Sequence, residues 1–508
     1  MPPRRAESRF LTVAAFATVL VGVLLALGVQ TVPVGRYEIH DKGMLGTLVL
    51  VAAAFALPLC ARMVAAPHPS NTALARKVAI LVVTGFALQH GLALAENRGW
   101  NGMRDRMVGR GHAEFALEAG KLQSAWAALR DYETIAAEKS FLPSKPPGQL
   151  LFYMAVADLA DAVVPDRWSV PPPDRPEVET SRQWRLINTA LFVYPLLSML
   201  TLLPLTYLGL ALLGRDLALW PAFLYMLCPP VQLVTLHLDQ TLYPLLVTTL
   251  WAFAVRAVCV AGATRDDPGA ARSVARTRAL WAGAGALAWL AQFVSFSVLP
   301  AFPLTAVLVW AARATIRKVD RPLPWRPLLR GALLALAVFA LLTALLAAAA
   351  GYNPLHAFQR SLAHHHRWMR WNESLRWPAA RLNLLEFFYW IGPPIVLAFG
   401  WQCAKGIASL VRRRIDGRST PAMGTAAILA ATAIFGATYG EVARLWLFLV
   451  PAVILSATPT FAHLVADANT DTGADVNAST ARRQRMLLVT AALQGAWMFC
   501  LKAMQDFA

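Results

Sequence analysis

Apolar segments of roughly membrane-spanning length recur along this chain from one end to the other. They lie at about 10–32, 44–64, 78–96, 148–164, 185–213, 216–234, 240–260, 279–297, 298–314, 329–350, 383–411, 423–438, 443–466 and 486–502. Hydrophobic residues make up 57% of the sequence, charged residues only 15%, and the mean hydropathy is +0.48. A water-soluble core cannot accommodate so many such segments, so the pattern predicts an all-α polytopic membrane protein. The first segment lacks a small-residue cleavage site, and we expect it to be retained as a span.

The formal net charge of +18 would suggest nucleic-acid binding in a soluble protein. Here the basic residues cluster in short loops between apolar segments, so membrane topology explains them better and no nucleic-acid partner is predicted. Because basic loops stay in the cytoplasm, we expect about thirteen spans with the N-terminus inside. The cytoplasmic loops would then include Arg76, Arg276, Arg317, Arg413 and Arg483.

The segment at 148–164 is predicted to lie along the membrane surface instead of crossing it. It is short and carries Asp158 and Asp161, and a crossing here would put four later basic loops outside. The result is a long external loop at about 97–184, which we expect to contain juxtamembrane helices. We divide the chain into two N-terminal spans with a cytoplasmic loop (1–77), a transmembrane core (78–466), and a cytoplasmic loop with the last span (467–508).

The external loop contains the sequence Ser-Lys-Pro-Pro-Gly-Gln at 144–149. The two prolines fix φ and lack N–H groups, so the backbone is stiff and Lys145 is held at the water–lipid boundary. Taken alone, this pattern also fits a helix start with a snorkelling lysine.

With this topology, polar residues that are unusual for a membrane chain gather on the external face. Asp239 stands out because it lies between two apolar segments, where an unpaired carboxylate is costly. Three adjacent histidines at 364–366 would point about 100° apart on a helix and could not share one ion, and the five cysteines lack zinc-site or disulfide spacing. No metal or cofactor is therefore predicted. The external candidates are His112, Glu114, Glu118, Asp131, Lys145, His237, Asp239, His365, Arg367, Tyr439, Glu441 and Arg444.

At these positions the chain resembles the GT-C superfamily of membrane glycosyltransferases, nearest its protein O-mannosyltransferase and aminoarabinose transferase branch, over most of residues 78–466. Glu114 matches the acidic residue of that branch's first large external loop. Lys145-Pro146-Pro147 matches the element before a juxtamembrane helix, and Asp239 matches an Asp at the outer end of a later helix hairpin. The segment at 440–448 also looks like one found in related bacterial proteins. The resemblance implies a GT-C-like fold with Glu114 and Asp239 as catalytic residues, while Glu118 and Asp131 stay open as alternatives to Glu114.

The resemblance also implies an activity: transfer of a hexose or pentose from a polyprenyl-phosphate-linked sugar to an acceptor glycan, lipid or protein. The active site would face the periplasm or exterior from the inner membrane, and no metal would be needed at the leaving group. The implied substrate-binding residues are His112, Lys145, His237, His365, Arg367, Tyr439, Glu441 and Arg444. A transporter or flippase of lipid-linked sugars, a lipid-linked polysaccharide polymerase or ligase, and a structural scaffold remain alternatives.

Overall fold

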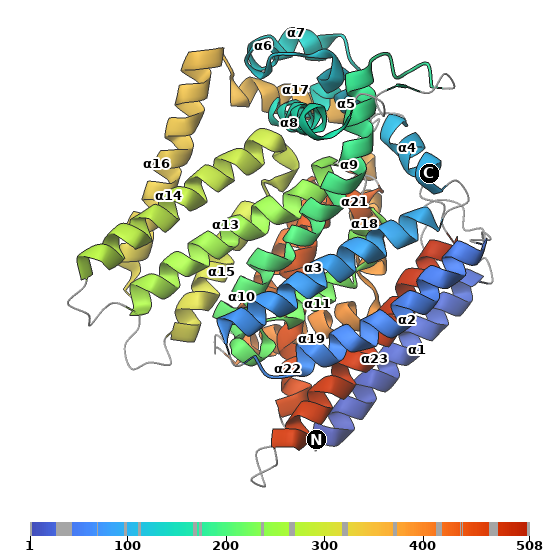
Figure 1. Ribbon diagram of the computed structural model, residues 1–508. Coiled ribbons are helices and arrows are strands. Elements are labelled where there is room, and N and C mark those ends of the chain that lie inside the picture. The colour runs from blue at the N-terminus through green and yellow to red at the C-terminus, as the bar shows by residue number, and fades with distance from the viewer. Residues whose placement is uncertain are drawn as a thin grey trace.

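The computed structural model describes residues 3–26, 43–68, 70–95, 99–109, 113–165, 170–171, 175–234, 238–263, 270–316, 324–368, 373–412, 419–436, 438, 440–466 and 476–504. All regular secondary structure in these residues is helical (Figure 1). The first half contains α1 (Pro3–Ala26), α2 (Gly43–Ala65), α3 (Asn71–Leu94), α4 (Gly99–Val108), α5 (Ala113–Lys121), α6 (Ala125–Arg130), α7 (Tyr132–Ala137), the 3₁₀ helix η1 (Leu142–Ser144), α8 (Gly148–Val163), α9 (Ser181–Leu200), α10 (Leu202–Leu213), η3 (Arg215–Leu217), α11 (Trp220–Met226), α12 (Pro229–Leu233) and α13 (Leu238–Ala263). The second half contains α14 (Ala270–Val294), η4 (Phe296–Val298), α15 (Ala301–Ile316), α16 (Trp325–Ala350), α17 (Pro354–Trp368), η5 (Glu373–Leu375), α18 (Arg376–Ile391), α19 (Pro393–Val411), α20 (Thr420–Phe435), α21 (Val442–Leu445), η6 (Leu447–Leu449), α22 (Val450–Ala466) and α23 (Val476–Met504).

Eight helical segments of the described chain are long and apolar enough to cross a membrane. They are Met44–Ala65, Asn71–Leu94, Ser181–Leu213, Gln240–Gly262, Phe296–Thr315, Trp325–Ala350, Pro393–Val411 and Leu447–Val465. The prediction of an all-α polytopic membrane protein is thus confirmed. The other predicted crossings, among them α1, α14, α20 and α23, are not among these eight segments.

Two of the predicted apolar segments are interrupted. The segment at 216–234 is divided into the short helices α11 and α12. The segment at 383–411 breaks at Gly392, which has a φ of 98° and separates α18 from the membrane-spanning α19. A Cβ at this position would lie 2.5 Å from Gln494 Nε2, so both the backbone conformation and the close approach of α23 require glycine.

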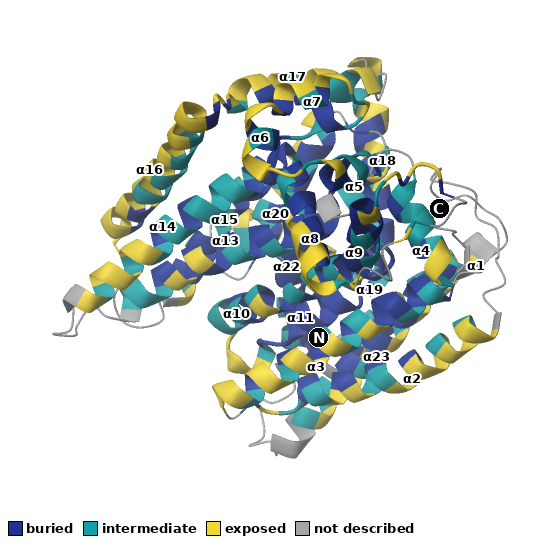
Figure 2. Ribbon diagram, turned by 45° about the horizontal axis from the view of Figure 1, so that its top comes forward, coloured by how far each residue is buried: buried dark blue, intermediate teal, exposed yellow. Residues whose placement is uncertain are grey.

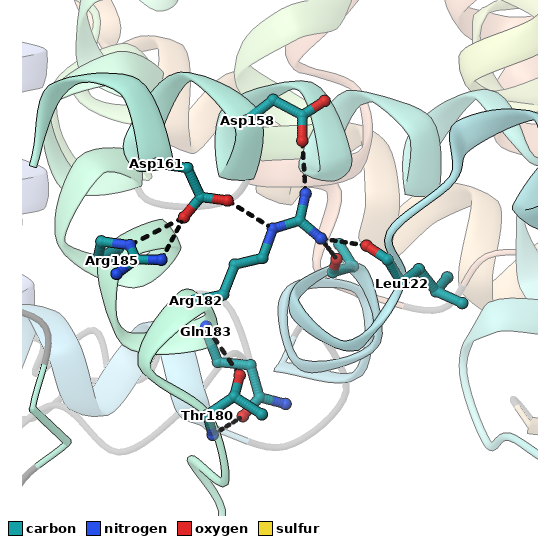
Figure 3. A network of polar contacts seen from close by, with 8 residues as sticks. Leu122, Asp158, Asp161, Thr180, Arg182, Gln183 and Arg185 are labelled. Atoms are coloured by element: carbon teal, nitrogen blue, oxygen red, sulfur yellow. Dashed lines mark hydrogen bonds and ion pairs between the residues drawn. The ribbon is translucent and has the colours of Figure 1, made fainter.

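The segment at 148–164 forms α8, which is not among the helices able to span the membrane. Figure 3 shows why two aspartates are tolerated on it. Arg182 at the start of α9 is 8% exposed, and its guanidinium pairs with Asp161 at 2.8 Å and with Asp158 at 2.5 Å. The same guanidinium donates to the carbonyl oxygens of Leu122 and Ala119, so α8 is tied to α5 and α9.

The two ends of the molecule are built differently. Helices α5 to α8 and α17 lie together at the top of Figure 1, beyond the long helices. At the other end, Arg215 donates to the carbonyl oxygen of His68 and to Asn71, and Arg483 pairs with Asp216 at 3.0 Å. The turn at Arg215 and Asp216 therefore contacts two of the loops predicted to be cytoplasmic, those that contain Arg76 and Arg483.

The larger of two hydrophobic clusters among the described residues runs through the molecule, from Leu11 in α1 to Leu501 in α23. The three predicted regions of the chain share this core, and their boundaries stay predictions. Helix α16 lies at the rim, where none of the residues in its most apolar stretch is buried (Figure 2). Such a surface suits contact with lipid chains.

Candidate functional site

The Lys-Pro-Pro element lies between η1 and α8. Lys145 follows η1 in an extended conformation, with φ −130° and ψ 160°, and Pro147 precedes the first residue of α8 without a side-chain cap. A Cβ on the next residue, Gly148, would lie 2.3 Å from the carbonyl oxygen of Phe293. Glycine therefore lets the start of α8 approach the end of α14 closely.

Glu114 holds the backbone that leads to Lys145. Its Oε1 accepts from the N–H of Ser140 at 2.8 Å, and its Oε2 accepts from Phe141 at 2.5 Å and Leu142 at 3.1 Å. A carboxylate oxygen has two lone pairs, so Oε2 is saturated and Oε1 has one lone pair left. The structure thus joins two predicted site residues, Glu114 and Lys145, through one short segment.

A buried tyrosine, Tyr132, also holds the segment at 142–145. The Tyr132 hydroxyl lies 2.9 Å from the carbonyl oxygen of Leu142 and 3.0 Å from that of Lys145. Tyr132 is only 2% exposed, so its buried hydroxyl holds the carbonyl groups of Leu142 and Lys145 in place.

Helix α17 covers the segment from the other side. Arg360 pairs with Glu133, donates to the Lys145 carbonyl oxygen at 3.3 Å, and lies 5.4 Å from the centroid of the Tyr132 ring. The Ser361 hydroxyl donates to the Ser144 carbonyl oxygen, and the Trp368 ring packs against Phe141 with centroids 4.5 Å apart. Lys145 therefore projects from a rigid base made by α5, α7 and α17.

The Lys145 side chain reaches the first turns of α13. Its Nζ donates to the Tyr243 hydroxyl at 3.3 Å and lies 5.6 Å from the centroid of that ring. Asp239 lies four residues before Tyr243 and hence on the same face of α13, although its side chain is outside the described part of the structure. Lys145 is thus a neighbour of the helix turn that carries Asp239.

Gln149 extends this contact inside α8. The Tyr243 hydroxyl donates to Gln149 Oε1 at 3.4 Å, while Gln149 Nε2 is buried without a hydrogen-bond partner among the described residues. Gln149 and Tyr243 are each 1% exposed. An unpaired buried donor costs about 1–3 kcal/mol, which makes this amide a candidate for contact with a ligand.

The segment at 438–444 is fixed by α18. Asn383 donates to the Thr438 carbonyl oxygen at 2.6 Å and accepts from the Gly440 N–H at 3.0 Å. Glu441 has a φ of 59°, a conformation that costs a non-glycine residue about 1 kcal/mol or more, and its carboxylate pairs with Arg444.

Glu386 lies beneath the same segment and is 1% exposed. Neither of its carboxylate oxygens has a hydrogen-bond partner of good geometry. Burial raises the pKa of Glu386 to about 7, although the N–H groups of Val442 and Ala443 favour the charged form. This carboxyl group is therefore poised to change its charge near neutral pH.

The remaining predicted residues are distributed as follows. His112, His237 and Tyr439 lie outside the described residues. His365 and Arg367 lie in the last turn of α17, the helix that covers the Lys145 segment. Burial and then Arg367 lower the pKa of the neighbouring His364, so its imidazole is neutral at neutral pH. Of the alternative carboxylates, Glu118 pairs with Lys139 at 2.8 Å and Asp131 with Arg130 at 3.2 Å.

The sequence interpretation overlooked Gln149, Asn383 and Glu386. Glu386 and Asn383 carried the signal already used for Asp239, a polar side chain inside an apolar segment. Among the described residues, no group of three or more His, Cys, Asp or Glu side chains could hold a metal ion.

No protein-family model and no curated protein matches the chain. Among solved structures, it is similar to one described as the crystal structure of ArnT from Cupriavidus metallidurans in the apo state. The match covers 85% of this chain and 78% of that one, with a TM-score of 0.48 and 14% sequence identity. At this level of similarity the substrates of one protein do not carry over to the other.

Proposed function

We propose that this chain is a membrane glycosyltransferase that takes a hexose or pentose from a polyprenyl-phosphate donor. The observation that carries the proposal is the contact of Lys145 with Tyr243, which presents a cation beside the helix turn that holds Asp239. A lipid phosphate needs such a cation close to the hydrocarbon boundary. The site would lie at the end formed by α5 to α8 and α17 and would face the periplasm or exterior of an inner-membrane protein.

The proposed reaction is a displacement at the anomeric carbon. An acceptor hydroxyl, on a glycan, lipid or protein, forms a bond to that carbon, while the bond from the carbon to the lipid phosphate oxygen breaks. A carboxylate takes the hydroxyl proton, and the electron pair leaves with the phosphate. Glu114 would accept this proton through Oε1, the oxygen that keeps a lone pair.

The other site residues have binding roles in this proposal. Lys145 and Arg444 would neutralise the lipid phosphate, and Asp239 would orient Lys145 or bind sugar hydroxyls. The residues proposed to contact the rest of the donor and the acceptor are His112, His237, His365, Arg367, Tyr439 and Glu441.

Lys145→Ala tests the proposal. Purified protein is given a polyprenyl-phosphate sugar together with candidate acceptors, and release of the lipid phosphate is measured. We expect Lys145→Ala to reduce release about a hundredfold or more, because the leaving group loses its cation. Lys121→Ala is the matched control, since Lys121 lies in the same loop region and pairs only with the exposed Glu179 among the contacts described.

Equal release by the Lys145 and Lys121 variants would contradict the proposed role of Lys145. Movement of an intact lipid-linked sugar across a liposome membrane, with no release of lipid phosphate, would instead identify a flippase or transporter.

A further inference from the structure

We propose that Gln149 binds the same lipid phosphate as Lys145, by donating from Nε2 to a phosphate oxygen. This inference rests on the proposed function and adds a binding residue to that site. It starts from the buried amide nitrogen of Gln149, which has no hydrogen-bond partner in the described part of the chain and lies next to the contact between Lys145 and Tyr243.

The orientation of the Gln149 side chain follows from Tyr243. The hydroxyl of Tyr243 accepts from Lys145 Nζ and donates to Gln149 Oε1, so the three side chains form a chain of donors and acceptors. The amide oxygen is used within the protein, and the two N–H bonds of Nε2 remain. Buried amide donors almost always have an acceptor, so a ligand that supplies an acceptor would satisfy the N–H groups of Gln149 Nε2.

The surrounding groups favour an anion as that acceptor. An ammonium group at Lys145 and an amide N–H₂ at Gln149 are both donors, and only an acceptor can bridge them. Gln149 also lies in the first turn of the sixteen-residue helix α8, whose N-terminus has no side-chain cap. The partial positive charge of a helix N-terminus adds to that of Lys145.

Phosphate fits these donors better than a sugar hydroxyl does. A non-bridging phosphate oxygen carries charge and accepts several hydrogen bonds at once, so it satisfies an ammonium and an amide together. A sugar hydroxyl can also accept from both donors, but it is neutral and does not offset the charge of the Lys145 ammonium. The inference therefore assigns Gln149 to the phosphate and not to the sugar.

The test uses farnesyl phosphate, which has the lipid and the phosphate but no sugar. Binding to the purified full-length protein is compared for wild type, Gln149→Leu and Gln149→Glu. Leucine removes the donor, and glutamate keeps an oxygen for Tyr243 but replaces the donor by a negative charge. We expect affinity to fall about tenfold to a hundredfold for leucine, the usual effect of losing a hydrogen bond to a charged group, and further for glutamate.

Gln402→Leu is the matched control, because Gln402 is also buried but lies in the membrane-spanning helix α19. Farnesol, which lacks the phosphate, is the control ligand. The inference is wrong if both Gln149 variants bind farnesyl phosphate like wild type, or if they lose farnesol binding equally. A wild-type protein that binds no farnesyl phosphate would instead overturn the proposed function itself.

Discussion

At the residue scale, Glu114 has a structural role in addition to the catalytic role proposed for it. Glu114 was predicted as a catalytic carboxylate, and its three backbone hydrogen bonds show that it also fixes the segment before Lys145. Such a clamp could not be inferred from sequence, because Glu114 and Phe141 are far apart in an external loop whose path is set by tertiary contacts. Its effect on activity would therefore combine positioning and proton transfer.

Glu114→Gln is expected to reduce transfer about a hundred- to ten-thousandfold, the usual effect of losing a general base. The glutamine oxygen replaces only one carboxylate oxygen, so an N–H of the 140–142 segment would face the new amide group and stability would fall by about 1–3 kcal/mol. Turnover and the thermal midpoint are both measured, with the exposed Glu179→Gln as control. Near-normal turnover, combined with loss in Asp131→Asn or Glu118→Gln, would show that another carboxylate of the same loop is the base.

Glu386 gives a prediction about pH. Its pKa of about 7 in the folded protein exceeds the usual value of 4.5, so folding favours the protonated form. Its contribution to stability is complete below about pH 4.5 and is lost as pH rises to about 7. The shift corresponds to about 3 kcal/mol, so the wild-type protein should lose this stability between about pH 4.5 and 7.

A glutamine at position 386 cannot ionise, so Glu386→Gln should remove most of this pH dependence. At about pH 8 the variant should therefore be more stable than the wild-type protein. Thermal unfolding in detergent across the pH range measures the effect. Glu373→Gln, at an exposed residue paired with Arg376, is the control. Parallel stability curves for wild type and Glu386→Gln would show that the buried carboxyl group does not titrate in this range.

At the scale of helices, the sequence predicted that the segment at 148–164 would not cross the membrane, but it did not predict which contacts hold this segment in place. The charge of the later loops, the short length of the segment, and Asp158 and Asp161 together placed 148–164 at the membrane surface, and α8 is not among the helices able to span a membrane. The partner, Arg182, belongs to the next span, and its contacts with Leu122 and Ala119 depend on how three helices meet. The break at Gly392 was not predicted, because hydropathy continues across it, and its positive φ and the approach of Gln494 are set by the tertiary structure.

Arg182→Lys should loosen α8. Lysine keeps the charge but lacks the planar fork that contacts Asp158, Asp161 and the two carbonyl groups together. We expect a loss of about 1–3 kcal/mol and faster proteolysis between 148 and 180. Arg185→Lys is the control. Arg185 also pairs with Asp161, and this substitution leaves the contacts of Arg182 unchanged. Equal protease resistance of the two variants would mean that the Arg182 network does not anchor α8.

At the scale of the whole molecule, the two ends are built from different parts of the chain. Basic loops meet through Arg215 and Arg483 at one end, and the helices around Lys145 form the other. Which end faces the cytoplasm is a prediction from the distribution of basic residues. It matters for function, because a donor bound near Lys145 would be used only on the side that this end faces.

Single cysteines in a cysteine-free background can determine this orientation. Glu138→Cys, at an exposed position after α7, should react with a membrane-impermeant thiol reagent in intact cells, whereas Arg276→Cys, exposed on α14, should react only after the membrane is opened. Both positions are solvent-exposed in the folded protein, so a difference between them reports sidedness and not burial. Labelling of position 276 in intact cells without labelling of position 138 would reverse the orientation, and the proposed transfer would then take place in the cytoplasm.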